Sequence, residues 1–205
     1  MIVIIQARSS SKRFPRKILF KIKKKLLIDY VISRVNLSKK IKKIIVSTSS
    51  HKSDNELVSH LKKNRVSYYR GSLKNVALRL YYTAKKYRSN FFIRISGDSP
   101  LIDPKIINRA VEKFIKNRKI DIVTNVFPRT FPSGQSVEII RTKIIKSNIS
   151  KMTPSEKEHV TSFFYSNFAK FRIVNFKNKN SQKYKKKLKF SVDKKSDLKK
   201  IFKYF

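Results

Sequence analysis

Apolar residues along the chain follow two alternating patterns, short β-branched runs and longer segments with helical spacing. The first run, residues 2–5, has four apolar residues in succession, which is typical of a strand buried on both faces. Similar runs predict strands at 44–46, 66–69, 91–95 and 120–123. Apolar residues three and four positions apart predict helices at 26–35, 54–61, 76–87 and from Pro104 onward. This alternation indicates an α/β fold with a largely parallel sheet.

The pattern changes after residue 125, where Pro128, Pro132 and Gly134 interrupt the periodicity. They belong to a loop that leads to residues 137–140. Beyond it we predict strands at 171–174 and 188–192 and helices at 156–168 and 197–204. The Lys- and Asn-rich residues 177–187 are expected to form an exposed loop. Because there is no internal repeat and no evident boundary, we expect one domain over residues 1–205, with an elaboration at about 128–168.

The composition is strongly basic, with a formal net charge of +39 from 51 Lys and Arg against 12 Asp and Glu. A nucleic-acid-binding module is one alternative that this charge leaves open. However, the basic residues are spread along nearly the whole chain, and abundant Lys, Ile, Asn, Phe and Tyr fit an AT-rich coding sequence. We therefore expect no specific nucleic-acid partner, although the positive field would concentrate anionic substrates.

Several other classes are excluded by what the sequence lacks. No apolar run approaches the roughly 18 residues of a membrane span, and a cytoplasmic location is expected. The absence of cysteine excludes disulfides, thiolate metal sites and a cysteine nucleophile. His51, His60 and His159 lack metal-ligand spacing, and no nucleophile–base arrangement indicates a serine hydrolase.

Polar segments follow three of the predicted strands, where ligands of parallel α/β sheets bind. Small hydroxyl residues follow the first strand, together with Arg8, Arg13 and Lys17. Residues 47–50 follow the second strand, and Gly97 and Asp98 follow the strand at 91–95. A loop of small residues and cations is suited to a polyphosphate, although a basic surface loop is the alternative in so basic a chain.

The few acidic residues are candidates for holding a hard cation. Asp98 is either a Mg²⁺ ligand or the cap of a turn before Pro100, and Asp193 is either a second ligand or a turn residue. Asp103, before Pro104, is expected to be a helix N-cap, and Asp197 a cap or first-turn residue.

Six short motifs occur in order along the chain. They are Gln6-Ala7-Arg8 with Ser10 to Lys17, Arg70-Gly71-Ser72 with Val76 and Arg79, Arg94 to Pro104, Pro132-Ser133-Gly134 with Val137-Glu138, Glu158-His159-Val160-Thr161, and Ser191-Val192-Asp193. In order and spacing they resemble the cytidylyltransferases of the spore-coat-polysaccharide type, which are relatives of the acylneuraminate and Kdo cytidylyltransferases. The resemblance covers essentially the whole chain.

This resemblance implies a nucleotide-diphospho-sugar transferase (Rossmann-like) fold, a mostly parallel mixed sheet flanked by helices. It also implies attack of a sugar acid or sugar phosphate on CTP, with release of pyrophosphate, in surface-glycan biosynthesis. Mg²⁺ is the implied cofactor, and a homodimer through the region after Pro128 is a family expectation. The roles that the resemblance assigns are catalysis for Arg8, Arg13 and Lys17; nucleotide binding for Gln6, Ala7, Arg8, Ser10, Ser11, Arg79, Arg94, Ser96 and Gly97; sugar binding for Gly134, Glu138 and His159; and metal binding for Asp98 and Asp193.

The chain departs from the family pattern at a few of these positions. Ser10 and Arg16 stand where the family has glycine, Gln135-Ser136 replace an acid after Gly134, and Lys194-Lys195 replace an acidic or proline-containing turn. These departures leave open a second alternative, a protein that binds the nucleotide without turnover.

Overall fold

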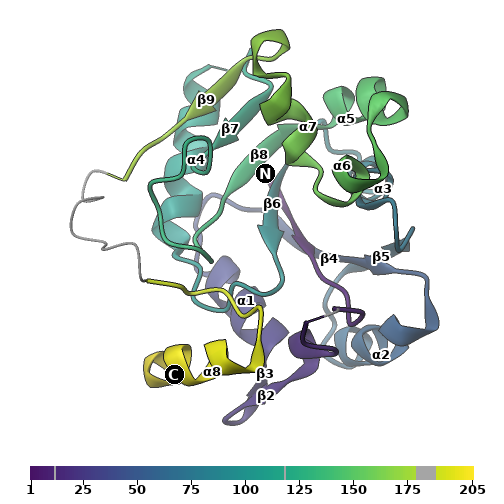
Figure 1. Ribbon diagram of the computed structural model, residues 1–205, viewed down its shortest axis with the longest axis vertical. Helices are drawn as coiled ribbons and strands as arrows, with labels where there is room; N and C mark the ends of the chain where they lie inside the picture. Colours follow the sequence, from purple (N-terminus) through teal and green to yellow (C-terminus); the bar gives the residue numbers. More distant parts are fainter. Residues whose placement is uncertain (12, 118, 179–187) are drawn as a thin grey trace.

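Seven strands form the main sheet, in the order β5-β4-β1-β6-β8-β7-β9 (Figure 1). The computed structural model describes residues 1–11, 13–117, 119–178 and 188–205. In chain order the strands are β1 Ile2–Gln6, β4 Lys43–Ser49, β5 Tyr68–Gly71, β6 Phe91–Ser96, β7 Ile122–Thr124, β8 Glu138–Arg141 and β9 Ile173–Asn175. Only the pairs that β8 makes with β6 and β7 are antiparallel, so the prediction of a largely parallel sheet is confirmed.

Helices cover both faces of this sheet. The helices are α1 Leu27–Asn36, α2 Asn55–Lys63, α3 Val76–Lys86, α4 Pro104–Lys116, α5 Thr142–Asn148, α6 Pro154–Glu158, α7 Thr161–Ser166 and α8 Lys195–Ile201. Short 3-10 turns lie at Lys17–Leu19, Lys52–Asp54, Ile149–Lys151, Phe168–Lys170 and Phe202–Tyr204, and a small hairpin joins β2 Lys21–Ile22 to β3 Lys25–Leu26. Among the described residues, no helix has the length and apolar content needed to cross a membrane.

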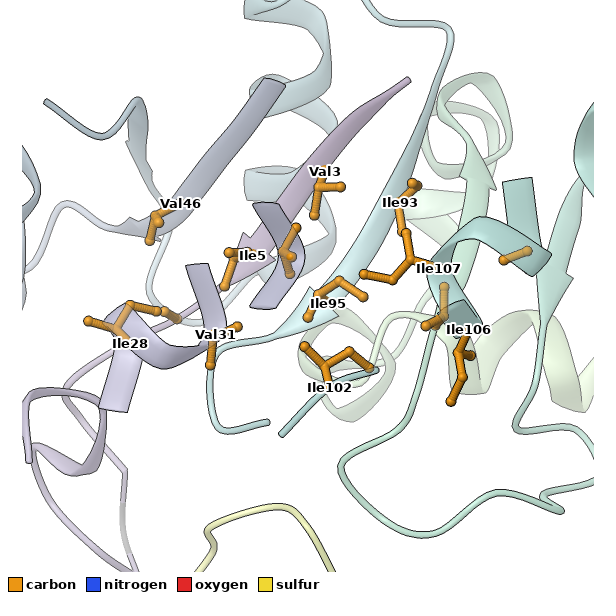
Figure 2. Packing of buried hydrophobic residues seen from close by; sticks show 14 of the residues in the cluster. Val3, Ile5, Ile28, Val31, Val46, Ile93, Ile95, Ile102, Ile106 and Ile107 are labelled. Atoms are coloured by element: carbon orange, nitrogen blue, oxygen red, sulfur yellow. The ribbon is translucent and has the colours of Figure 1, made fainter. Parts of the chain in front are cut away.

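The alternation of side chains along β1 explains why its apolar run is unbroken. Val3 and Ile5 belong to a core cluster shared with α1 and α4. Figure 2 shows them on the same side of the sheet as Ile93 and Ile95, with Val31 close to Ile5. Ile4, between them, belongs to a second cluster, which α3, α5 and α7 cover on the opposite face. A strand buried on both faces needs apolar residues at every position.

Two predicted elements after residue 150 are wrong. The helix expected at 156–168 is two helices, because His159 leaves helical geometry at φ −102° and ψ 63° and the next residue, Val160, turns into the core. The segment 188–192 is not a strand. It makes one isolated bridge, from Lys189 to Ser133, and Val192 donates its N–H to the Asp98 carbonyl at 2.9 Å. Helix α5 was not predicted, and residues 179–187 of the expected loop lie outside the described residues.

The candidate site lies between β1 and β6, where the order in which strands are added to the sheet reverses. After β1 the chain continues to β4 and β5 on one side, whereas after β6 it continues to β8 and β7 on the other. Gln6 and Ser96 are paired in register, so the loops that follow these two strands start at the same level. A crevice between the carboxyl ends of such strands is the usual ligand site of open α/β sheets.

Candidate active site

The loop after β1 folds tightly over the end of the sheet. Ser11 and Arg16 both donate their N–H groups to the Ser9 carbonyl, at 2.9 and 2.8 Å, which closes the loop on itself. Arg16 has φ 59° and ψ 17°, in the left-handed region that favours glycine. Ser10 is not among the described residues with a positive φ. Of the two glycine replacements, only Arg16 therefore strains the backbone.

Gly97 brings the second loop close to the first. Its N–H donates to the Gln6 carbonyl at 2.9 Å, and a Cβ at this position would lie 2.8 Å from the Cβ of Ala7. Because that separation is too short for two carbon atoms, glycine is required here. The predicted residues Gln6, Ala7, Ser96 and Gly97 therefore form one surface across the two strand ends.

The three cations that were predicted to act in catalysis, Arg8, Arg13 and Lys17, all meet carboxylates from distant parts of the chain. Arg8 forms an ion pair with Glu158. Arg13 Nη2 lies 2.9 Å from Asp193 Oδ1, and Lys17 Nζ lies 2.5 Å from Asp98 Oδ2. The structure thus brings together the residues predicted for phosphate and for metal.

Lys17 lies between the two carboxylates that were predicted to bind metal. Its Nζ also donates to the Val192 carbonyl at 2.7 Å and lies 3.9 Å from Asp193 Oδ1. Lys189 Nζ holds the other oxygen of Asp193 at 2.8 Å. Burial by itself would raise the pKa of Asp193, but the hydrogen bond from Lys189 and the charges of Lys17 and Arg13 outweigh it and hold that pKa below its usual value.

The donor set of Asp98 and Asp193 fits Mg²⁺. Both supply hard carboxylate oxygens from different elements to one point, where a cationic side chain already lies. Within the described residues no group of three or more His, Cys, Asp or Glu surrounds a metal position. Two protein carboxylates are nevertheless typical of Mg²⁺ sites, in which phosphate oxygens and water complete the octahedron.

The capping roles predicted for two other acids are confirmed. Asp103 accepts a hydrogen bond from the Lys105 N–H at 2.8 Å at the start of α4. Asp197 accepts the N–H groups of Asp193 and Lys194 at 2.8 and 2.9 Å, and Lys189 lies 2.7 Å away. Although burial opposes the charged form, the hydrogen bonds from Lys189 and the backbone lower the pKa of Asp197 to about 2. Asp197 therefore fixes the turn that carries Asp193.

Asp54 is a site residue that the sequence analysis missed. Its side chain is fully buried and accepts the Ser9 N–H at 2.6 Å, the Ser49 N–H at 3.1 Å and the Ser49 hydroxyl. Burial alone would favour the neutral acid, but the hydrogen bonds from Ser49 and Ser9 outweigh it and lower the pKa of Asp54. The carboxylate thereby ties the basic loop after β1, which we call the phosphate-type loop, to the end of β4.

Arg79 lies beneath this loop. Arg79 is only 1% exposed, and its Nη1 donates to the Ser72 carbonyl at 2.6 Å. Within the described part of the chain, its Nε and Nη2 atoms have no hydrogen-bond partner. Burial and the nearby charge of Arg8 lower the pKa of Arg79 to about 10, while Asp54 acts in the opposite direction. Arg79 thus supplies positive charge under the loop from the core.

A cavity of about 370 Å³, called here the acceptor-side cavity, lies next to β6. Its lining residues come from β6, the segment before β8, β8 itself and the α6–α7 region: Arg94, Ser96, Val126, Arg129, Ser136, Glu138, His159, Thr161, Ser162 and Tyr165. Two of the predicted sugar-binding residues, Glu138 and His159, are among them. Gly134, with φ +89°, packs against the backbone of Phe190, where a Cβ would lie only 2.4 Å from the carbonyl carbon.

A buried network joins the acceptor-side cavity to β1. Arg94 donates from Nε to Gln6 Oε1 at 3.0 Å and forms an ion pair with Glu138 through Nη1. The Tyr165 hydroxyl donates to Glu138 Oε1 at 2.5 Å. Burial and the charge of Glu138 raise the pKa of Tyr165, so the phenol stays neutral. Ser96 Oγ donates to Asp98 Oδ1 at 2.6 Å, which connects the cavity to the candidate metal position.

Comparisons with known proteins agree over nearly the whole chain. The family model for cytidylyltransferases matches residues 2–204. The uncharacterized protein MJ1063 of Methanocaldococcus jannaschii is 33% identical over 174 residues, which cover 84% of this chain and 70% of that protein. The spore coat polysaccharide biosynthesis protein SpsF of Bacillus subtilis is 26% identical over 180 residues, covering 84% and 73%.

Solved structures give the same result. A cytidylyltransferase structure from Leptospira borgpetersenii superposes with a TM-score of 0.91 and 31% identity, covering 100% of this chain and 87% of that one. The structure of CMP:2-keto-3-deoxy-manno-octonic acid synthetase complexed with CTP has a TM-score of 0.73 at 16% identity, covering 99% and 97%. The second likeness shows that the nucleotidyltransferase fold is shared.

Proposed function

Because the chain belongs to the cytidylyltransferase family, we propose that it transfers CMP from CTP to a sugar acid or a sugar phosphate and releases pyrophosphate. We further propose that this reaction is Mg²⁺-dependent, takes place in the cytoplasm and contributes to the biosynthesis of a surface glycan. The glycan part of the proposal is supported by the spore-coat-type motifs and by the similarity to SpsF, a spore coat polysaccharide biosynthesis protein.

The observation that carries this proposal is the meeting of Arg13 and Lys17 with Asp98 and Asp193 at the carboxyl ends of the central strands, with Arg8 of the same loop paired to Glu158. A triphosphate with a bound cation presents the reverse arrangement, with phosphate oxygens for the basic side chains and a metal ion for the carboxylates. Each group of this site therefore has a complementary partner in a metal–CTP complex.

In the proposed reaction an oxygen of the acceptor attacks the α-phosphorus of CTP. A new P–O bond forms, an attacking hydroxyl releases its proton to water, and the bond to the oxygen that bridges the α- and β-phosphates breaks, so that pyrophosphate leaves with the electron pair. Arg8, Arg13 and Lys17 neutralise the charge that grows on the leaving pyrophosphate, and Arg79 adds to this field from below. Phosphoryl-type transfer depends mainly on positioning and charge neutralisation, so the site needs no protein nucleophile.

Asp98 and Asp193 would hold the Mg²⁺ ion, which when bound neutralises phosphate charge and orients the α-phosphate. Ser96, hydrogen-bonded to Asp98, would keep that carboxylate directed toward the nucleotide. The Arg94–Glu138 pair would form the wall between the bound nucleotide and the acceptor-side cavity.

The test is to incubate the purified protein with CTP, Mg²⁺ and a panel of 3-deoxy-manno-octulosonate, acylneuraminates and sugar phosphates, and to measure pyrophosphate. We expect release with at least one acceptor and loss of metal-dependent turnover in Asp98→Asn. Asp103→Asn is the matched control, because asparagine also caps helices well and Asp103 lies at the start of α4. A folded protein that binds no CTP would refute the proposal.

The alternative function, nucleotide binding without turnover, is favoured by one observation, the left-handed backbone of Arg16 in the phosphate-type loop. It predicts CTP binding with no pyrophosphate release across the whole panel. The homodimer through residues 128–168 also remains a proposal, and light scattering of the purified protein would test it.

A further inference from the structure

The acceptor-side cavity carries an excess of positive charge. Two arginines line it, Arg94 and Arg129, together with one carboxylate, Glu138. The side chain of Glu138 is only 3% exposed, and its two oxygens are occupied by Arg94 and by the Tyr165 hydroxyl. Arg94 and Glu138 thus neutralise each other, and both are held by partners within the protein.

Arg129 is the cation of this cavity that is left without a neutralising partner. Its Nη1 donates to a neutral group, Ser136 Oγ, at 3.1 Å. In the part of the chain that the structure describes, no carboxylate lies within ion-pairing distance of its guanidinium. Unlike Arg8, Arg13 and Lys17, each of which meets a carboxylate, Arg129 therefore has unused hydrogen-bonding capacity beside the cavity.

The backbone that carries Arg129 is held in place by packing. Arg129 forms a bridge with Val126, and the ring of Phe127 stacks on Tyr165 with centroids 4.7 Å apart and planes 4° apart. Asn175 donates to the Pro128 carbonyl at 3.1 Å. These contacts fix the start of the Arg129 side chain next to the same Tyr165 that lines the cavity.

We infer that Arg129 binds an anionic group of the acceptor, a carboxylate or a phosphate, and so selects acidic sugars over neutral ones. This inference rests on the proposed function. A guanidinium presents a planar pair of donors that matches either anion, and such charge-assisted contacts are stronger than neutral hydrogen bonds. Hydroxyl groups of Ser96, Ser136, Thr161 and Ser162 line the same cavity and suit the hydroxyls of a sugar.

The orientation of the acceptor follows from the two ends of this lining. Ser96 is hydrogen-bonded to Asp98, so the part of the cavity beside Ser96 adjoins the candidate metal position. The attacking oxygen of the acceptor belongs at that end. In a sugar acid this oxygen is a hydroxyl, and the carboxylate is directed toward Arg129 and Ser136. In a sugar phosphate the attacking oxygen belongs to the phosphate itself, and the other phosphate oxygens are directed toward Arg129. Glu138, with both oxygens occupied, positions Arg94 between the two substrates.

The experiment compares the wild-type protein with Arg129→Ala, Arg129→Lys and the control Lys62→Ala, which removes one exposed charge on α2. Steady-state turnover gives the KM of the acceptor and of CTP separately. We expect Arg129→Ala to raise the acceptor KM about 10- to 100-fold, the range for losing a charge-assisted hydrogen bond. The CTP KM should stay within about 2-fold, Arg129→Lys should recover part of the loss, and Lys62→Ala should match the wild type. A sugar-acid arm and a sugar-phosphate arm distinguish the two anions.

A binding measurement makes the result independent of turnover. Saturation-transfer NMR in the presence of α,β-methylene-CTP would follow 3-deoxy-manno-octulosonate, glucose 1-phosphate and neutral glucose on the wild type and on Arg129→Ala. We expect an acidic probe to bind the wild type and to lose binding in the variant. Neutral glucose binding as well as the acidic probes, or an unchanged acceptor KM in Arg129→Ala, would overturn the inference. Absence of pyrophosphate release by the wild type, with probe binding that depends on Arg129, would refute only the proposed reaction.

Discussion

Asp54 offers the sharpest test of how the phosphate-type loop is held. Replacing it with alanine leaves three donors without their acceptor, the N–H groups of Ser9 and Ser49 and the Ser49 hydroxyl. A buried donor left unpaired costs about 1–3 kcal/mol, and removing one member of a buried charged pair costs about 3–5 kcal/mol. The buried positive charge of Arg79 would also lose the favourable electrostatic interaction with the Asp54 carboxylate. Because these separate costs are not additive and the loop can relax once the carboxylate is removed, we expect Asp54→Ala to lower the free energy of unfolding by about 3–5 kcal/mol.

Two milder variants keep this prediction measurable if Asp54→Ala does not fold. Asp54→Asn retains one side-chain oxygen and should cost about 1.5–3 kcal/mol, and Ser49→Ala, which removes one hydrogen bond, about 1–2 kcal/mol. Glu112→Gln is the control, since the Glu112 side chain is 55% exposed, and it should change stability by less than about 0.5 kcal/mol. Urea unfolding followed by circular dichroism gives each value.

The pH dependence of unfolding supplies the refuting measurement. Because the pKa of folded Asp54 lies below its unfolded value, its stabilising contribution is present above the unfolded pKa, about 3.9, and is lost as the pH falls through the folded pKa. The difference between wild type and Asp54→Asn should therefore shrink below about pH 4. A difference at pH 7 smaller than about 0.5 kcal/mol would show that the buried carboxylate does not hold the loop.

Three further predictions concern the neighbouring residues. Arg16→Gly should be more stable than Arg16→Ala by about 1 kcal/mol in urea unfolding, because both lose the pair with Glu56 but only glycine relieves the left-handed backbone; equal stabilities would contradict this. Lys17→Met should raise the affinity for Mn²⁺ without CTP, measured by electron paramagnetic resonance, since Lys17 lies between Asp98 and Asp193; an unchanged or weaker affinity would argue against a metal there. Gly134→Ala should lower the thermal midpoint and weaken metal-dependent turnover, since a Cβ would collide with the segment that leads to Asp193; a variant with wild-type stability would show that this segment docks differently.

The strands and most helices of the first 125 residues could be predicted from the sequence, because buried parallel strands require unbroken apolar runs. The position of the site could be predicted as well, because ligands of parallel sheets bind at the carboxyl ends of the strands. The same rule predicted that Asp98 approaches the loop after β1. Helix α5 was missed since Thr142 follows β8 directly, with no Gly or Pro to mark the change of period. The break at His159 was missed because it depends on where Val160 packs.

The partners within the site were harder to predict. That Glu158 would meet Arg8, or that Asp54 would bind Ser9, depends on contacts between residues far apart in the chain. Asp54 and Arg129 carry no local signal apart from their residue type. In a chain with 12 acidic residues, the scarcity of Asp and Glu was the available reason to inspect each carboxylate.

The pairing of Arg13 and Lys17 with Asp193 has a consequence for synthesis of the protein on the ribosome. The basic loop leaves the ribosome well before the carboxylate that completes its surroundings. Until residue 193 has left the exit tunnel, a nascent chain presents an anion-binding loop without one of its candidate metal ligands. Such a chain is exposed to any polyanion nearby, ribosomal RNA included. Under the proposed function, capture of CTP together with a metal ion has to wait until Asp193 is in place.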